Sequence, residues 1–477
     1  MPLAAEECLA PGACVARALE GFRDRPQQRR MAEVVEEAVA GRRHLVVEAG
    51  TGVGKSFAYL VPVMLHLARG GGPVAVATRT IALQEQLVRR DIPLLLDALG
   101  LQLDVALAKG RGNYVCRRRL ELAHTEGGSL FGSPDERRQL ERIVEWARRS
   151  EDGSLADLPL RPAASVWETV RAERGNCLHQ RCRFYRPCAY QRSRRRMYRA
   201  DLVVANHALI LADLALREAG ARYLPDYEVL VLDEAHALED GAADHFGFSM
   251  GPLGLARQLA RLHGTHKQAG LLGRVGDPPR LHERVEAVAA AARLLFDGVA
   301  RRRGDRPELR LRRPGQFENP LSSPLRDLLG SMHDLHPQIS DPEVALEWKA
   351  RTDRLEEHLS TVELVHGLLD PELVYWIEAA GRGRRSVLRA APVEVAPVLR
   401  RALFRRVPSV ILTSATLRVG GSFDHFESRV GLDEPAELGL GSPFDFRRQC
   451  RLLLHPPHPH PPHPPHDPAG AERGPRG

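Results

Sequence analysis

The chain has 477 residues, 43% of them hydrophobic and 27% charged, a composition that excludes collagen-like and wholly disordered proteins and suggests about three packed domains. No uncharged apolar run reaches the roughly 18 residues that a membrane helix needs. The N-terminus carries acidic residues where a signal peptide would be basic. We therefore expect a cytoplasmic protein with no membrane contact. The net charge of +7 suits a polyanionic partner but does not identify one.

Lysine is rare in this chain. Of the 68 basic residues, only Lys55, Lys109, Lys267 and Lys349 are Lys. A GC-rich genome, which favours Arg codons, explains the bias most simply. Because Arg cannot replace a compact ammonium group at every site, each retained Lys is a stronger candidate for a site that requires Lys.

Strand-like and helix-like segments alternate in much of the chain. The expected strands are 44–50, 73–80, 201–206, 227–236 and 407–417. The expected helices beside them include 26–40, 54–68 and 81–93. Short apolar strands that alternate with helices predict a parallel sheet covered by helices.

Two segments interrupt this pattern. Residues 110–200 are rich in Arg and Cys, whereas 250–385 are dominated by Leu, Ala, Arg and Glu and include an amphipathic helix at 281–303. The sequence therefore predicts one α/β domain with two insertions. From His455 onward, the last 23 residues hold nine Pro and five His, and such a segment cannot bury a core.

The segment AGTGVGKS at 49–56 fits the phosphate-binding loop pattern, with Ala49 in place of the usual Gly. It lies between an expected strand and an expected helix, so its glycines can bring backbone N–H groups to a phosphate. Lys55 would reach the β- and γ-phosphates of ATP, and Ser56 would hold Mg²⁺. The alternative is a Gly-rich turn that binds nothing. The candidate ATP-binding residues of the loop are Gly50, Thr51, Gly52, Gly54, Lys55 and Ser56.

The expected strand in VLVLDEAH, at 229–236, ends in two acidic residues. In P-loop NTPases an Asp at such a strand end holds Mg²⁺, and an adjacent Glu polarises the attacking water. Asp233 and Glu234 match these catalytic roles. Alone, an Asp-Glu pair after a strand is more often the start of a helix, but the phosphate loop upstream favours the catalytic interpretation.

The chain has seven Cys, and an odd number disfavours a disulfide framework. Four thiolates can complete a [4Fe–4S] cluster or a zinc site, and spacings of 60, four and five residues do not choose between them. The four Cys with these spacings are Cys116, Cys177, Cys182 and Cys188. Cys8, Cys14 and Cys450 fall outside the pattern and are expected to be buried or free thiols.

In this order, the motifs resemble those of superfamily 2 helicases. The run Asp-Glu-Ala-His at 233–236 is similar to their DEAH box, and 49–56 is similar to their motif I. RPQQRRM at 25–31 resembles the Q motif that contacts adenine, with Gln28 as its key residue. TSATL at 413–417 resembles motif III, which couples the ATP state to nucleic-acid binding.

A more specific resemblance is to the iron–sulfur DNA helicases of the DinG/XPD group, on the DinG side. The segments that carry it are KGRGNYVC at 109–116, the three later Cys, VVANHALIL at 203–211, APVEVAPVLRRALF at 391–404 and GSPF at 441–444. The resemblance covers about residues 20–450. It implies an ATP-dependent DNA helicase that moves 5′→3′ on single strands and unwinds duplexes in repair or replication.

The resemblance also implies the ligands. ATP and Mg²⁺ are expected at the P-loop, with Arg25 and Gln28 contacting adenine. The insertion at 109–200 has the position of the family's iron–sulfur domain, so the resemblance implies a [4Fe–4S] cluster at the four Cys rather than zinc or no metal.

The family's iron–sulfur domain contacts DNA, so the partner implied is single-stranded or forked DNA. Ten Arg lie between Arg171 and Arg199, and Arg forks pair with phosphates. A solvated basic face is the alternative. A monomer is expected, and no protein partner is indicated. Further candidates near the Cys are Lys109, Arg111, Arg117, Arg118 and Arg119 for phosphates, and Tyr114, Phe184 and Tyr185 for stacking on bases.

The predicted fold class is therefore α/β, a RecA-like P-loop domain with a parallel sheet, interrupted by an iron–sulfur insertion and by a helical insertion that resembles the family's arch domain. The expected parts are 1–108, 201–249 and 386–450 for the RecA-like lobe, 109–200 for the Cys-rich insertion, 250–385 for the helical insertion, and 451–477 for a disordered Pro/His-rich tail.

The family's motor has a second RecA-like lobe that follows the SPF motif and supplies an arginine finger. Here SPF lies at 442–444, shortly before the Pro/His-rich tail. We expect a truncation or a change of reading frame at that point, with a natural linker or a His-rich metal tract as alternatives. Alone, the chain is expected to bind ATP weakly, to hydrolyse little and to unwind nothing. The competing functions are a non-enzymatic ATP- and DNA-binding fragment and an unrelated P-loop kinase or transport ATPase.

Overall fold

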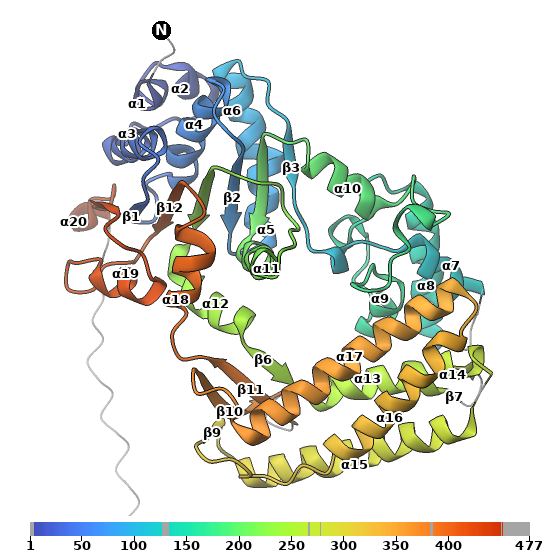
Figure 1. The fold of residues 1–477 in the computed structure, drawn as a ribbon. Coiled ribbons are helices and arrows are strands. Elements are labelled where there is room, and N and C mark those ends of the chain that lie inside the picture. The colour runs from blue at the N-terminus through green and yellow to red at the C-terminus, as the bar shows by residue number, and fades with distance from the viewer. Residues whose placement is uncertain are drawn as a thin grey trace, which may run out of the picture.

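A computed structural model of the chain shows a sheet domain, a Cys-rich part and a part built from long helices, arranged around a ring (Figure 1). Cys450 and residues 452–477 of the Pro/His-rich tail lie outside the residues that the structure describes. Within the described residues, no helix is long and apolar enough to cross a membrane. The described residues are 4–125, 133–265, 268–276, 278–381, 385–449 and 451.

A seven-stranded sheet forms the centre of the molecule. Every neighbouring pair of its strands is parallel. The strand order is β13-β1-β12-β5-β2-β4-β3, and the expected parallel α/β fold is confirmed. The strand bounds are β1 (Leu45–Ala49), β2 (Val74–Thr78), β3 (Val105–Leu107), β4 (Leu202–Asn206), β5 (Val229–Asp233), β12 (Ser409–Ser414) and β13 (Ala436–Leu440).

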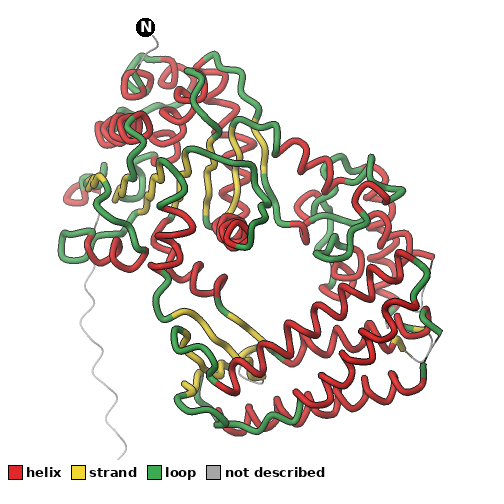
Figure 2. Tube along the Cα trace, in the orientation of Figure 1, coloured by secondary structure: helices red, strands yellow, loops and turns green. Residues whose placement is uncertain are grey.

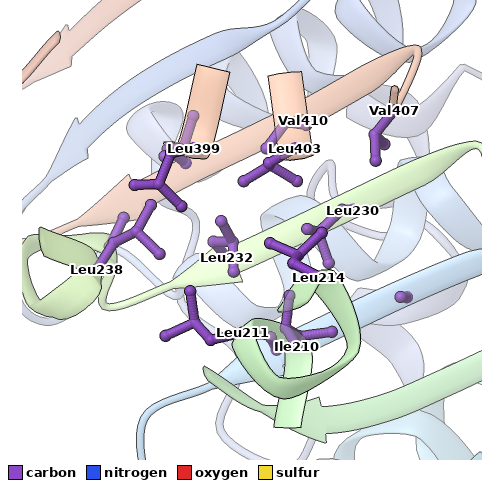
Figure 3. Close-up of a cluster of buried hydrophobic side chains, with 14 of the residues drawn as sticks. Ile210, Leu211, Leu214, Leu230, Leu232, Leu238, Leu399, Leu403, Val407 and Val410 are labelled. Atoms are coloured by element: carbon purple, nitrogen blue, oxygen red, sulfur yellow. The ribbon is translucent and has the colours of Figure 1, made fainter. Parts of the chain in front are cut away.

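Helices cover both faces of this sheet (Figure 2). Helices α3 (Pro26–Ala40) and α4 (Lys55–Ala68) share one apolar core with alternate residues of β1 and β5. The remaining residues of β5 point to the opposite core, as the period of two along a strand requires. There Leu230 and Leu232 face α11 (His207–Glu218) and the segment that contains Leu399 (Figure 3).

Two short helices, α1 (Ala5–Cys8) and α2 (Cys14–Ala18), extend the core beside α3. Cys8 is buried, Cys14 is half-buried, and both thiols are free. The helix expected at 81–93 is divided by a π-helical turn. Its pieces are α5 (Ile81–Gln86), the turn Leu87–Asp91 and α6 (Ile92–Leu99).

The Cys-rich insertion has a small core of its own. Trp167, Ile143 and Leu120 are buried there, so the segment folds as a unit although its sequence periodicity is weak. Its helices are α7 (Arg117–Thr125), α8 (Pro134–Arg149), α9 (Ala164–Val170) and α10 (Ala189–Met197).

The second insertion packs long helices around a third core. It also contains a four-stranded antiparallel sheet in the order β6-β11-β10-β9. This sheet was not expected, because residues 250–385 were predicted to be helical. Strand β11 continues past residue 385, so the boundary expected there falls within this sheet. The elements are β6 (Phe248–Met250), α13 (Pro252–His263), α14 (Leu271–Arg274), α15 (Pro279–Arg303), β9 (Glu308–Leu311), α16 (Ser322–Leu335), α17 (Pro342–Gly367), β10 (Leu373–Ala380) and β11 (Arg385–Pro392).

A buried cluster of charges joins the two insertions. Glu173, in the Cys-rich insertion, accepts hydrogen bonds from Arg119 of α7, at 2.9 Å, and from Arg351 of α17, at 2.6 Å. Arg261 of α13 lies 3.5 Å from the same carboxylate oxygen. Burial alone would raise the pKa of Glu173, but the three guanidinium groups outweigh it and lower the pKa to about 2. We call these four residues the Glu173 cluster.

Candidate active site

Three motif-bearing strands are neighbours in the sheet. β1 leads into 49–56, β5 ends at Asp233, and β12 ends in the TSAT sequence. Because β1, β12 and β5 are parallel and adjacent, their carboxyl ends meet at one edge, where α/β proteins commonly bind ligands.

The phosphate loop has a backbone that only Gly tolerates. Gly52 and Gly54 both have φ of +85°. A Cβ atom added to Gly54 would lie 2.1 Å from Nε2 of Gln28, whose amide donates to the Gly54 carbonyl oxygen at 2.9 Å. The loop ends at the first turn of α4, where free N–H groups and the positive helix end suit an anion. This donor set fits the phosphates of a nucleotide.

The Lys55 ammonium group lies between this loop and the DEAH sequence. Its Nζ donates to the Ala49 carbonyl oxygen at 3.3 Å and lies 3.9 Å from Oε1 of Glu234. The folded chain thus brings together the Lys and the carboxylates, which are far apart in the sequence.

Asp233 is a buried carboxylate at the end of β5. Its Oδ1 accepts from the backbone N–H of Glu234 at 3.0 Å, and its Oδ2 accepts from the Tyr59 hydroxyl at 3.2 Å. Burial and the neighbouring Glu234 raise the pKa of Asp233 to about 6, while the Lys55 ammonium opposes this rise. A buried oxygen ligand whose charge is incompletely balanced is well suited to a hard cation such as Mg²⁺.

Glu234 contacts motif III directly. It adopts the left-handed region with φ of +57°, and its Oε2 lies 3.5 Å from Oγ of Ser414 and 3.4 Å from Nδ1 of His236. His236 Nδ1 and Ser414 Oγ are 2.8 Å apart. Ser414 and His236 lie in motifs that are recognisable in the sequence, but no sequence pattern predicted a role for either side chain.

A pocket of about 330 Å³ lies beside the phosphate loop. Arg25, Gln28 and Ser56, all expected at the nucleotide site, line it together. Phe22 and Phe57 also line it, and only their proximity to the motifs could have indicated them from the sequence. Thr51 lies on the exposed side of the loop.

The GSPF segment lies against the same loop. A Cβ atom on Gly52 would come within 2.4 Å of the Phe444 ring, and one on Gly50 would lie 3.8 Å from Ser442. The last of the resemblance motifs therefore contacts motif I.

The four predicted Cys are brought together although 60 residues separate the first two. All four have free thiols and line one pocket. Burial raises the pKa of the Cys182 and Cys188 thiols, and the neighbouring Cys116 and Cys177 raise it further. In the described part of the chain, no three Cys, His, Asp or Glu are grouped around a point for a single metal ion. Four soft thiols facing one cavity do fit a cluster that needs four thiolate ligands.

Comparisons with known proteins agree with these motifs. A family model described as DEAD/DEAH box helicase matches residues 25–126, and one described as DEAD_2 matches 175–252. The ATP-dependent DNA helicase YoaA of Escherichia coli is 32% identical over 450 residues, which cover 93% of this chain and 68% of that protein. The ATP-dependent helicase DinG of Mycobacterium tuberculosis is 33% identical, over 90% of this chain and 65% of that protein.

The chain belongs to the DinG/YoaA family of ATP-dependent helicases. The predicted resemblance to this family is confirmed, and the chain spans about two thirds of the length of these two relatives. A solved XPD helicase is similar at a TM-score of 0.47 and 14% identity, over 88% of this chain and 62% of that one.

The basic residues of this DinG/YoaA-family chain divide into buried and exposed groups. Arg118 and Arg119 are only 3% and 6% exposed, and they pair with Glu343 of α17 and with Glu173, respectively. The expectation that they contact phosphates is therefore not met. Tyr114 was expected to stack on bases, but it is 1% exposed and its hydroxyl lies 2.6 Å from that of Ser193. The exposed Arg of the cluster are Arg174, Arg181, Arg183, Arg186, Arg195, Arg196 and Arg199.

Phe184 and Tyr185 remain half-exposed beside the Cys pocket. Arg183 lies over the Phe184 ring, and Arg195 lies over the Tyr185 ring, at 4.9 and 5.7 Å from the ring centres. Paired guanidinium and aromatic groups of this kind can contact both the backbone and the bases of a single strand.

Proposed function

We propose that this chain forms the ATP-binding lobe of a DinG-type DNA helicase, with ATP as its substrate. The carrying observation is the meeting of Lys55, Asp233 and Glu234 at the carboxyl ends of β1 and β5, which are separated in the sheet only by β12. Loop 49–56 would hold the phosphates, and Arg25 and Gln28 would contact adenine. Among the catalytic residues, Lys55 balances phosphate charge and Glu234 accepts a proton from the attacking water.

Mg²⁺ fits the oxygen atoms of Ser56 and Asp233, and when bound it would neutralise charge on the phosphates. The contact of Ser414 with Glu234 supports a role for motif III in reporting the state of the nucleotide to the rest of the protein. The chain's own residues therefore provide charge balance, a base and a link between motifs.

Nucleotide binding tests this proposal most directly, because the chain alone is expected to hydrolyse little ATP. Purified protein should bind a fluorescent ATP analogue in the presence of Mg²⁺, and Lys55→Ala should weaken binding about 10-fold or more, the loss of one charge-assisted contact. Lys349→Ala is the matched control, because Lys349 is exposed and forms an ion pair with Asp353 within the helical insertion. Equal affinity in both variants would exclude the site.

We propose that Cys116, Cys177, Cys182 and Cys188 hold a [4Fe–4S] cluster. Their convergence on one pocket supports this proposal. Protein purified without oxygen should be coloured and contain iron and sulfide, and Cys188→Ser should lose both, whereas Cys14→Ser should retain them. A colourless protein that contains zinc would overturn the assignment.

We further propose that single-stranded or forked DNA is the partner, with 5′→3′ movement in the complete motor and a cytoplasmic monomer as the working form. The exposed Arg and the two flanking aromatic rings support DNA contact at the Cys-rich insertion. Nucleotide turnover that DNA stimulates and Lys55→Ala abolishes would separate a helicase lobe from a non-enzymatic ATP- and DNA-binding fragment.

A further inference from the structure

Tyr59 lies between the two residues that would hold Mg²⁺. It belongs to α4, one turn after Ser56, and its side chain is fully buried. Its hydroxyl donates to Oδ2 of Asp233 at 3.2 Å. Burial raises the pKa of the phenol, and the nearby Ser56 hydroxyl opposes this rise. One phenol group thus connects the helix of the phosphate loop with the acidic end of β5.

The other polar atoms of Asp233 are held from elsewhere. Its Oδ1 accepts from the Glu234 N–H at 3.0 Å, and its carbonyl oxygen lies 2.8 Å from Nε2 of the buried His207. The backbone is therefore fixed independently of Tyr59. Removal of the Tyr59 hydroxyl would take one bond from the buried Oδ2, while the ring would still fill the same space.

We propose that Tyr59 is a positioning residue for Mg²⁺ at the ATP site. Its hydroxyl sets the Ser56 oxygen and the Asp233 carboxylate in their relative places before the cation binds, so less reorganisation is needed on binding. Groups that orient metal ligands in this way typically change metal affinity by about 10–100-fold when they are removed. The inference rests on the proposed ATP site and assigns a role that neither the motif pattern nor the phosphate loop requires.

The test is Tyr59→Phe, assayed by the Mg²⁺ dependence of binding of a non-hydrolysable fluorescent ATP analogue. We expect the variant to need about 10-fold more Mg²⁺ for half-maximal binding and to bind the analogue as well as the natural protein does when Mg²⁺ is chelated. Tyr114→Phe is the matched control, because Tyr114 is also buried and also loses one hydroxyl contact, to Ser193. Its Mg²⁺ dependence should not change.

A second measurement separates positioning from folding. If Tyr59 acts through Asp233, Tyr59→Phe should have no further effect on Mg²⁺ dependence in an Asp233→Asn background. A Tyr59→Phe protein with normal Mg²⁺ dependence, or one that loses binding equally with and without Mg²⁺, overturns the inference. If the natural protein binds no analogue at all, the proposed function fails instead.

Discussion

At the scale of single residues, two of the rare Lys occupy sites where a compact ammonium is required. Lys55 fits between a carbonyl oxygen and Glu234, and Lys109 is buried with its Nζ 2.9 Å from Ser154 Oγ and 3.3 Å from Asp152 Oδ2. A planar guanidinium would not fit either set of oxygen atoms without displacing them. Lys349, by contrast, forms an exposed ion pair that Arg could also form. In a chain with this codon bias, a retained Lys therefore indicates a site that requires Lys only where its side chain is also buried.

Two Gly with the same backbone conformation allow a sharp test of the nucleotide pocket. Gly54 has φ of +85° and Gly70 has φ of +83°, but a Cβ atom at Gly70 would meet nothing within 4 Å, whereas one at Gly54 would strike Gln28. We expect each substitution by Ala to cost about 1 kcal/mol of unfolding free energy through strain. Only Gly54→Ala should displace Gln28, and it should weaken ATP-analogue binding about 10-fold, the equivalent of one hydrogen bond.

Two measurements distinguish backbone strain from the displacement of Gln28. Urea unfolding reports the shared strain, and titration with the fluorescent analogue reports the displacement of Gln28. If Gly70→Ala weakened binding as much as Gly54→Ala did, the loss of affinity would come from general destabilisation. The assignment of Gln28 to the nucleotide pocket would then be wrong.

At the scale of elements, burial determined what the sequence could predict. The central strands are covered on both faces, so β5 and β12 contain the short apolar runs VLVL and VIL, which are easy to recognise. β10 and β11 are covered on one face and carry charged residues such as Glu378 and Arg389, which pair at 2.7 Å across the two strands. The alternation of apolar and polar residues along β10 and β11 was therefore not recognised in a segment that is otherwise mostly helical.

In the candidate site, too, the sequence predicted which residues are present but not where each side chain points. Local motifs predicted Lys55, Asp233 and the four Cys, because spacing and neighbouring strands are properties of the sequence. The burial of Tyr114 and the role of Tyr59 depend on which way a side chain points, and both are decided by contacts with residues far away in the chain. A count of Arg likewise could not tell the buried Arg119 from the exposed Arg199.

The Glu173 cluster should carry much of the stability between the two insertions. Glu173→Gln leaves the buried guanidinium groups of Arg119 and Arg351 and the half-buried one of Arg261 without their carboxylate. Such a loss typically costs 3–5 kcal/mol, and we expect about 3 kcal/mol less unfolding free energy at neutral pH. Because the pKa of Glu173 is lowered from 4.5 to about 2 in the folded chain, its contribution is complete above about pH 5 and is lost as the pH falls towards 2.

Tryptophan fluorescence during urea unfolding measures this effect, because all four Trp lie in the two insertions. Glu363→Gln is the control, since Glu363 pairs with the exposed Arg326 on the surface of the helical insertion, and its loss should cost less than about 1 kcal/mol. A difference between natural protein and Glu173→Gln that stays constant from pH 7 to pH 2 would contradict the assigned origin of the stability.

At the scale of the whole molecule, the insertions determine where positive charge is available. The Cys-rich insertion follows the edge strand β3, whereas the helical insertion follows the central strand β5 in the chain. The Glu173 cluster joins the two insertions away from the sheet (Figure 1). Arg118 and Arg119 are buried in the contacts that form this junction. The charge that remains exposed on the Cys-rich insertion includes the end of α10, which packs next to β3 at the edge of the sheet.

DNA binding should therefore depend on that end of α10 more than on total charge. Arg195, Arg196 and Arg199 are exposed there, and we expect their replacement by Ala to weaken binding of a single-stranded oligonucleotide. The plot of log K against log salt concentration should become shallower by about 0.7 for each phosphate contact removed. Arg301, Arg302 and Arg306, exposed near the end of α15, give a control with the same change in net charge. Non-specific attraction to net charge would affect both triple variants equally. If the two variants had the same salt slope, the DNA would bind elsewhere. A shallower slope in the α10 variant alone would place the DNA along the end of α10.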